Sequence, residues 1–377
     1  MSDSKATLIE VAGYSPSADW DEALRDALTD ALKALIAAGC GPQSIEAVAW
    51  EVDDLAAFHP SRHDVELLYR EVFAGFRKPV TLRRSGKPGL RVVITAAKSP
   101  PAADADQAVY RGYTRAELGR QYSPRGQTDM NVLFKQWSKD GAQARAPHGG
   151  LDLCYGPGRY ETFDLFMPPN VARPPVWVFL HGGYWQASDK NQHGQFAAGM
   201  LKAGYAVVMA NYGLAPETSV TTIVGQIQRL MACLAAQADN LSLDIGDLHL
   251  SGHSAGAHLA AMAALDQTSV PIRSVLLLSG LFDLEPLGLL PFGRLLQFDA
   301  ATIAALSPAR FAAPSTTRVA LAVGAAESDE FKRQSELLVS LWKAPPSLIV
   351  PGHHFSMLEG LNGGALLDLA LPLMRKG

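Results

Sequence analysis

The stretch from Leu248 to Met262 reads LHLSGHSAGAHLAAM, and it decides the fold. Its first residues have the apolar character of a strand, and its last residues are the Ala- and Leu-rich start of a helix. Ser254 stands at the junction, inside the pentapeptide GHSAG. A serine in a G-x-S-x-G pattern between a strand and a helix is typical of a nucleophile on a sharp turn. The pattern therefore predicts Ser254 as a nucleophile, with an ordinary serine between two glycines as the alternative.

The rest of the C-terminal part gives this pentapeptide its context. Apolar runs alternate with helical segments here: PVWVFLHG, AVVMANY, DLHLSG, RSVLLLSG, RVALAVG and PSLIV. Continuous apolar runs between helices indicate parallel strands that are buried on both faces. Before them come two polar helical stretches, 114–121 and 129–145, and a hairpin-like pair, 151–156 and 161–168. Residues 109–377 thus predict a doubly wound α/β domain with a mostly parallel sheet, the α/β-hydrolase fold.

A smaller domain is expected before residue 100. Strands and helices alternate in this part at 7–12, 18–39, 44–52, 63–76 and 90–97. This order predicts an α+β domain over 1–100, with helices on one face of a sheet. The segment 98–108, KSPPAADADQA, is rich in Pro and Ala and reads as a linker. A chain of 377 residues is also long for a single core, so two domains are favoured.

Charge and cysteine content limit the partners. With 33 basic and 37 acidic residues the chain has no basic surplus, so neither nucleic acid nor an anionic membrane is an expected partner. Cys40, Cys154 and Cys233 are far apart and lack C-x-x-C spacing, which fits a reducing compartment. The first residues do not resemble a secretory signal, and no apolar run approaches the roughly 20 residues of a spanning helix. A cytoplasmic protein is expected.

A nucleophilic serine needs a base and an acid downstream. VALAVGAAESDEF (319–331) predicts a strand followed by a loop with carboxylates, and IVPGHHFSML (349–358) predicts a strand followed by histidines. We expect His354 as the base, with His353 as an ordinary core or surface histidine. Glu327 is the expected acid because it lies at the tip of its strand. Asp329 is the alternative, although it resembles the first turn of the next helix.

The stretch VFLHGGYWQ (178–186) predicts an oxyanion hole after a strand. Glycines in an HGG loop let backbone N–H groups approach the developing oxyanion. Gly182 and Gly183 are the expected donors, together with the amide of Ala255 after the nucleophile. Tyr184 and Trp185 are candidates for lining a pocket that accepts an aromatic substrate, and packing at the domain surface is their alternative.

Metal and cofactor sites are not expected. His249 and His253 are four residues apart and His258 follows, but the first lies in a strand and the second in a turn, so they do not share a helix face. The chain has no P-loop and no dinucleotide-binding fingerprint. The expected partner is a small-molecule amide or ester.

The motifs HGGYW, ANYGLAP, GHSAGAHLAAM, SGLFDLEPL, GAAESDEFKRQS and GHHFSMLEGL together resemble kynurenine formamidases (arylformamidases) and their bacterial esterase relatives. YRGYTRAELGRQYSP and LDLCYGPGRYETFDLF resemble the N-terminal extension of that family. The resemblance covers about 109–377. It implies a Ser254-Glu327-His354 triad and hydrolysis, without a cofactor, of N-formyl aryl amines and of aryl or short acyl esters. A carboxylesterase with no formamidase role, and a binding protein that kept the fold, are the alternatives.

The first hundred residues are similar to the Rid (YjgF-type) imine and enamine deaminases, through ALIAAGCGPQSIEAVAWEVDDLAAFHPSRHDVELLYREVFAG. That family places an Arg before its penultimate strand and a Glu near the end of its last strand. The equivalent positions here are Val80 and Thr95. The resemblance therefore implies a structural role, with homo-oligomer formation through this domain, and a bifunctional hydrolase and deaminase is the alternative.

Overall fold

The computed structural model describes residues 7–38, 40, 44–58, 65, 80–98, 106–124, 130–266 and 270–375. The chain divides into two compact units, Met1–Thr114 and Arg115–Gly377, which are described separately. Apart from Val65, the helix expected over 63–76 lies outside the described residues, as does most of the linker expected over 98–108.

The first unit contains a four-stranded sheet in the order β1-β4-β2-β3. Its strands are β1 (Thr7–Ser15), β2 (Ile45–Val52), β3 (Val80–Arg84) and β4 (Leu90–Lys98). β4 is antiparallel to both β1 and β2, whereas β3 is parallel to β2. The apolar pattern alone did not predict β3, because its five side chains are all exposed and only Val80 and Leu82 are apolar.

Helix α1 (Trp20–Ala37) packs on this sheet. It begins after Asp19, whose carboxylate accepts the N–H groups of Asp21 and Glu22 as a helix N-cap. Its apolar side chains recur at helical spacing and are buried, so the helix and the sheet share one core. Two short strands, β5 (Ala108–Tyr110) and β6 (Tyr113–Thr114), pair with each other at the end of the unit.

The second unit is built on an eight-stranded sheet in the order β14-β13-β12-β11-β9-β10-β8-β7. The strands are β7 (Gly150–Cys154), β8 (Thr162–Phe166), β9 (Pro175–Leu180), β10 (Ala206–Ala210), β11 (Asp244–His253), β12 (Ile272–Leu278), β13 (Arg318–Gly324) and β14 (Leu348–Val350). Neighbours from β10 to β14 are parallel, and only β8 and β7 introduce antiparallel pairs. The predicted mostly parallel α/β-hydrolase sheet is confirmed.

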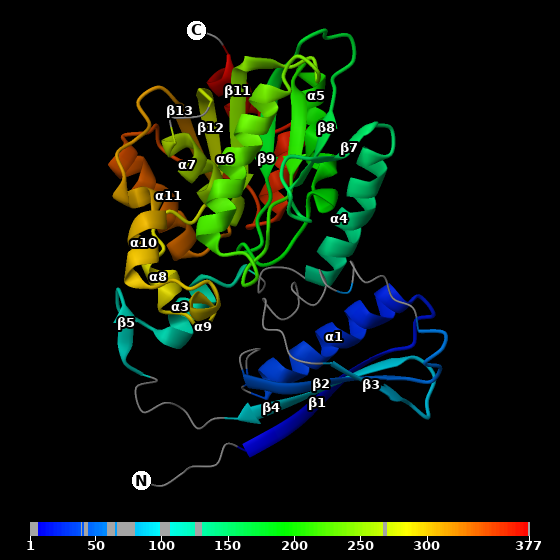
Figure 1. Cartoon of the computed structure of the whole chain (residues 1–377). Coiled ribbons are helices and arrows are strands. Elements are labelled where there is room, and N and C mark those ends of the chain that lie inside the picture. The colour runs from blue at the N-terminus through cyan, green and yellow to red at the C-terminus, as the bar shows by residue number, and fades with distance from the viewer. Residues whose placement is uncertain are drawn as a thin grey trace. The chain divides into compact units, whose positions relative to one another are not determined.

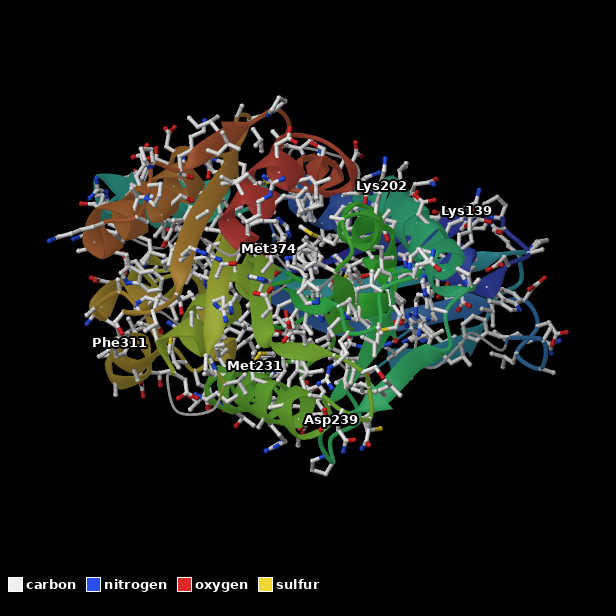
Figure 2. The ribbon with its side chains drawn as sticks, turned by 90° about the horizontal axis from the view of Figure 1, so that it is seen from above. Lys139, Lys202, Met231, Asp239, Phe311 and Met374 are labelled. Carbon is white, nitrogen blue, oxygen red and sulfur yellow. The ribbon has the colours of Figure 1, made fainter. Side chains whose placement is uncertain are left out.

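Helices cover both faces of this sheet (Figure 1). The longer helices are α4 (Met130–Arg145), α6 (Val220–Ala236), α7 (Ala255–Leu265), α11 (Asp329–Trp342) and α12 (Ala365–Met374). Shorter ones are α3 (Arg115–Gln121), α5 (Ala198–Lys202), α8 (Glu285–Gly288), α9 (Pro291–Leu295) and α10 (Ala300–Leu306). Figure 2 shows Met231 of α6 and Met374 of α12 on opposite sides of the strands.

One core cluster lies between the sheet and the helices α5 and α12, which cover one of its faces. It joins strand residues such as Trp177 and Phe179 to Met200 and Leu366, all almost fully buried. Among the described residues, no helix is both long and apolar enough to cross a bilayer.

The parallel strands bring distant parts of the chain to one edge of the sheet. β9, β11, β12, β13 and β14 run in the same direction, so their carboxyl ends, at Leu180, His253, Leu278, Gly324 and Val350, share this edge. In open α/β sheets ligands bind outside these ends. The segments that follow the five strands contain every residue predicted for the site.

Candidate active site

Ser254 lies on the sharp turn that the pentapeptide predicted. β11 ends at His253 and α7 begins at Ala255, so Ser254 is the only residue between strand and helix. Its φ of 55° and ψ of −118° are unfavourable for a residue with a Cβ, at a cost of about 1–3 kcal/mol. The turn requires close backbone packing, since a Cβ on Gly256 would lie 2.0 Å from the carbonyl oxygen of Leu180. This geometry holds the start of α7 against the end of β9.

Glu327 and His354 form a buried pair. The Nδ1 atom of His354 lies 2.6 Å from Oε2 of Glu327, and both residues are at most 4% exposed. The second carboxylate oxygen, Oε1, accepts hydrogen bonds from the Ser279 hydroxyl and from the Gly324 amide, the latter at 2.8 Å. Both oxygens of Glu327 are therefore oriented by fixed partners, and one of them is directed at the imidazole.

The charge state of Glu327 follows from these contacts. Burial alone would raise the pKa of this carboxyl, but the His354 imidazole and the hydrogen bonds from Ser279 and Gly324 outweigh it and lower the pKa of Glu327 below its ordinary value. Glu327 is thus a carboxylate at neutral pH, able to hold the Nδ1 proton of His354.

The two alternative residues occupy different positions. Asp329 is the exposed first residue of α11, after the N-cap Ser328. His353 caps the following turn, because its Nδ1 accepts the amide N–H groups of Phe355 and Ser356 at 3.2 and 3.4 Å. The structure therefore brings Glu327, rather than Asp329, to His354.

His253 connects the nucleophile turn to the loop that carries His354. Its Nε2 lies 2.7 Å from the backbone carbonyl of His354, and the two ring centroids are 4.5 Å apart. A carbonyl only accepts, so Nε2 of His253 must be the protonated nitrogen. Burial, followed by the nearby histidines, lowers the pKa of His253 well below its ordinary value, which keeps this ring neutral. The residue before Ser254 thus fixes the residue predicted to be its base.

The predicted oxyanion loop lies directly against Ser254. A Cβ built on Gly182 would lie 3.1 Å from Cβ of Ser254. Gly183 has a φ of +105°, and a Cβ there would lie 2.2 Å from the carbonyl oxygen of Ala187, so a larger residue does not fit. The amide of Ala255 belongs to the first turn of α7, where N–H groups have no partner within the helix. Of the three expected donors, Gly182 packs against Ser254 and Ala255 follows it directly in the chain.

Two residues that follow β10, Asn211 and Tyr212, bind the same loop. The Tyr212 hydroxyl donates to the carbonyl of His181 at 2.6 Å, and the two rings stack with centroids 4.3 Å apart. The Asn211 side chain donates to Asp189 at 2.9 Å and accepts the amide of Lys190 at 2.7 Å. The loop that follows β9 is therefore fixed at both of its ends.

A buried ion network adds a further anchor. Lys190 is 1% exposed, and its ammonium group lies 2.8 Å from Asp164 and 2.6 Å from Asp152. Arg145, the last residue of α4, contacts the same two carboxylates at 2.6 and 3.1 Å. Asp164 in β8 is fully buried and shares its two oxygens between the two cations. The network joins α4, the β7–β8 hairpin and the segment after the oxyanion loop.

Tyr184 and Trp185 differ in their surroundings. Tyr184 is half-buried, its ring lies 5.0 Å from that of Phe292, and its hydroxyl donates to the carbonyl of Tyr122 at 2.5 Å. Trp185 is fully buried against His258 and Phe298, at centroid distances of 4.9 and 5.6 Å. The indole environment favours the packing alternative for Trp185, and Tyr184 remains the candidate for contact with a substrate.

The three histidines considered for a metal have separate partners. His249 lies 2.8 Å from the Ser274 hydroxyl, and His258 Nε2 donates to the Leu306 carbonyl at 2.7 Å. With His253 bonded to the His354 carbonyl, these rings do not face a common point. Within the described parts of the chain, no group of three His, Cys, Asp or Glu side chains is placed to hold a metal ion.

Sequence reasoning missed some residues of this site. Ser279 donates a hydrogen bond to Glu327, and its backbone is left-handed, with a φ of 49°. It follows β12 in the SGLFDLEPL motif, and that position at a strand end was the available signal. Phe331 and Tyr122, which lie beside His354 and Tyr184, gave no signal of their own.

The fold and this edge of the sheet define a serine hydrolase of the α/β-hydrolase class. The BD-FAE family matches residues 163–276. Kynurenine formamidase of Danio rerio is 31% identical over 230 residues, which cover 56% of this chain and 76% of the relative. Kynurenine formamidase of Salmo salar is 31% identical over 245 residues, covering 60% and 82%. The chain belongs to the kynurenine formamidase family.

A solved structure extends the comparison to the fold of the second unit. A crystal structure assigned as a thioesterase, from Silicibacter sp. TM1040, has 32% sequence identity and a TM-score of 0.61. It is covered over 98% of its length and covers 67% of this chain. The fold is thus shared well beyond the segment around the serine.

Proposed function

We propose that this enzyme hydrolyses N-formyl aryl amides, and related small acyl amides or esters, through an acyl-enzyme on Ser254. His354 accepts the serine proton while the hydroxyl attacks the carbonyl carbon. Glu327 holds the imidazole in the tautomer that leaves its other nitrogen free to accept. His354 then donates the proton to the leaving amine or alcohol, and water repeats the cycle on the acyl-enzyme.

The oxyanion of the tetrahedral intermediate accepts hydrogen bonds from the amides of Gly182, Gly183 and Ala255. One such donor contributes on the order of 10²–10³ in rate. The Tyr184 ring, next to Phe292, is our candidate for contact with the aryl group. The observation that carries the proposal is the buried Glu327–His354 pair beside the strained Ser254 turn.

A comparison of substrates tests this proposal. The ratio kcat/KM is measured for formanilide and for phenyl acetate, with Ser254→Ala as the inactive control. We expect turnover of both and labelling of the wild type, but not of the control, by a fluorophosphonate probe. Turnover of esters alone would instead support a carboxylesterase, and absence of labelling would indicate a non-catalytic protein.

For the first unit we propose a Rid-like domain over 1–100 with an assembly role and no retained deaminase chemistry, ahead of a hydrolase domain over 109–377. Val80 and Thr95, at the expected catalytic positions, support this view, since neither side chain can act as an acid or base. Val80 is an exposed edge residue of β3, and Thr95 is half-buried in β4. The three free cysteines fit our proposal of a reducing, cytoplasmic location.

Light scattering on the full chain and on a variant that begins near Gln107 tests the assembly role. We expect a homo-oligomer that changes its subunit number when residues 1–106 are removed. An unchanged number would refute this role. Turnover of freshly generated 2-aminoacrylate by the full chain would make the enzyme bifunctional.

A further inference from the structure

A short segment at the end of α3 contacts both halves of the site. The Ser328 hydroxyl donates to the Gln121 carbonyl at 2.6 Å, and the Glu330 amide donates to the Gln121 side chain at 3.2 Å. One residue later, the Tyr122 carbonyl accepts the Tyr184 hydroxyl at 2.5 Å. Gln121 and Tyr122 belong to the RQYSP stretch, for which the proposed mechanism gives no role. They join the start of α11, next to Glu327, to the oxyanion loop.

The Tyr122 side chain continues the connection inside α11. Its hydroxyl donates to Oε2 of Glu330 at 2.8 Å and accepts the Gln334 amide at 2.8 Å. Tyr122 is 2% exposed, and burial together with the nearby Glu330 raises the pKa of its phenol, so the group remains a donor. Arg333 contacts both oxygens of Glu330 at 3.0 and 2.9 Å. The first turn of α11 is thus held by a fully paired buried network.

Phe331 connects this network to the predicted base. Its ring lies 5.8 Å from that of Tyr122 and 4.4 Å from that of His354, and the side chain is 1% exposed. His253 and Phe355 lie against the same imidazole, at centroid distances of 4.5 and 5.0 Å. His354 is therefore held among three rings, and one of them depends on the turn that Tyr122 fixes.

We propose that Tyr122 is a positioning residue that holds Phe331 against the His354 imidazole. Through its backbone carbonyl, which binds Tyr184, it also keeps the oxyanion loop at a fixed position relative to that imidazole. This inference rests on the proposed role of His354 as the base and acid of the reaction. Reactive groups must be held within a fraction of an ångström and some 10–20° of the productive geometry. A small displacement of the imidazole impairs proton delivery to the leaving group.

The test uses leaving groups that differ in their need for that proton. Phenoxide is a poor leaving group that His354 must assist, whereas 4-nitrophenoxide leaves without protonation. The variant is Tyr122→Phe, which keeps the ring. Glu330 keeps Arg333, and Gln334 keeps the Asp283 carbonyl at 2.8 Å, so no buried charge loses its only partner.

We expect kcat/KM for phenyl acetate to fall on the order of tenfold or more in Tyr122→Phe, and that for 4-nitrophenyl acetate to fall several-fold less. Both esters need His354 as the base for the attack, but only phenyl acetate also needs it as a general acid, which is worth about 10²–10⁴. A merely structural role reduces both values equally. The control is Trp342→Phe, which removes a hydrogen bond to the Phe311 carbonyl at the far end of α11. Its selectivity, the ratio of the kcat/KM values for phenyl acetate and 4-nitrophenyl acetate, should equal that of wild type.

A double variant tests the route through Phe331. When Phe331 is already replaced by Leu, adding Tyr122→Phe should change the selectivity by less than a further factor of about two. The effects of two substitutions are not additive when both act through the same contacts. Equal losses on both esters, or full additivity with Phe331→Leu, would overturn the inference. If Tyr122→Phe does not fold, the selectivity of Phe331→Leu alone decides.

These outcomes are separable from those of the proposed function. Failure of the wild type to cleave formanilide refutes its amide activity but leaves the two esters as a test of Tyr122. If the wild type cleaves amides only, formanilide and 4-nitroformanilide supply two amine leaving groups, of which the more basic aniline depends more on the proton from His354.

Discussion

Glu327→Gln is the substitution whose outcome the structure defines most sharply. The carboxamide has one oxygen and one NH₂ group, whereas the carboxylate accepts at both positions. The Gly324 amide, 2.8 Å from Oε1, can only donate, so the carboxamide oxygen must turn toward it. The NH₂ group then faces Nδ1 of His354, at the position where Oε2 now lies 2.6 Å away.

The consequence is a change of tautomer. An NH₂ group donates to Nδ1 of His354, so the imidazole proton moves to Nε2, and that nitrogen can no longer accept the serine proton. An amide in place of the acid costs on the order of 10⁴ in kcat in a well-studied triad. We expect a loss of 10³–10⁴, which corresponds to roughly 4–5.5 kcal/mol of transition-state stabilisation.

The assay is steady-state hydrolysis of phenyl acetate near pH 7.5, with melting temperatures to verify folding. Asp329→Asn is the matched control, because it also exchanges an acid for its amide but lies exposed at the start of α11. It should lose less than threefold. If Asp329→Asn lost more activity than Glu327→Gln, the assignment of the acid would be wrong.

Further predictions concern the nucleophile, the oxyanion loop and acid stability. Ser254→Ala should lose roughly 10⁶ in kcat with an unchanged fold, and activity within tenfold of wild type would refute its role. Gly183→Ala should lose at least about 10² in kcat, since its Cβ would lie 2.2 Å from the Ala187 oxygen, and circular dichroism checks that the fold persists. Burial lowers the pKa of His258 from 6.5 to about 4, so the unfolded chain binds a proton that the folded chain does not, and stability should fall as pH decreases from about 6.5 to 4. The free energy of unfolding, measured with urea at pH 6.5 and at pH 4, should decrease between these pH values by up to about 3 kcal/mol less in His258→Gln than in wild type.

The sequence was informative where position along the chain determines position in the fold. Ser254, Glu327 and His354 each follow an apolar run, and the ends of parallel strands share an edge, so strand order was enough to predict that the three residues lie at the same edge of the sheet. Apart from Ser279, which also follows a strand, the neighbours of these residues could not be found in this way. Tyr122 and Glu330 are 208 positions apart, and no period or spacing indicates that their side chains meet.

Local patterns failed for weakly buried elements. β3 is a short edge strand whose two apolar side chains, Val80 and Leu82, are exposed, and a two-residue alternation is too short to indicate a strand. For Trp185, the motif placed an aromatic residue near the oxyanion loop, but its direction depends on a left-handed backbone with φ 57°. Periodicity does not report such a conformation, and the side chain lies in the interior.

The shared carboxylate of Asp164 limits how this protein can change over evolutionary time. Removing one partner of a buried ion pair costs about 3–5 kcal/mol, a large part of the stability of an ordinary domain. Because Lys190 and Arg145 both contact Asp164, loss of this fully buried acid leaves the two cations only the more exposed Asp152 as a shared partner. Single substitutions at these positions should be eliminated by selection, while joint replacement by apolar residues remains possible. Homologues should therefore keep all three charges or lose them together, and a lineage that crosses between these states must pass through a destabilised intermediate.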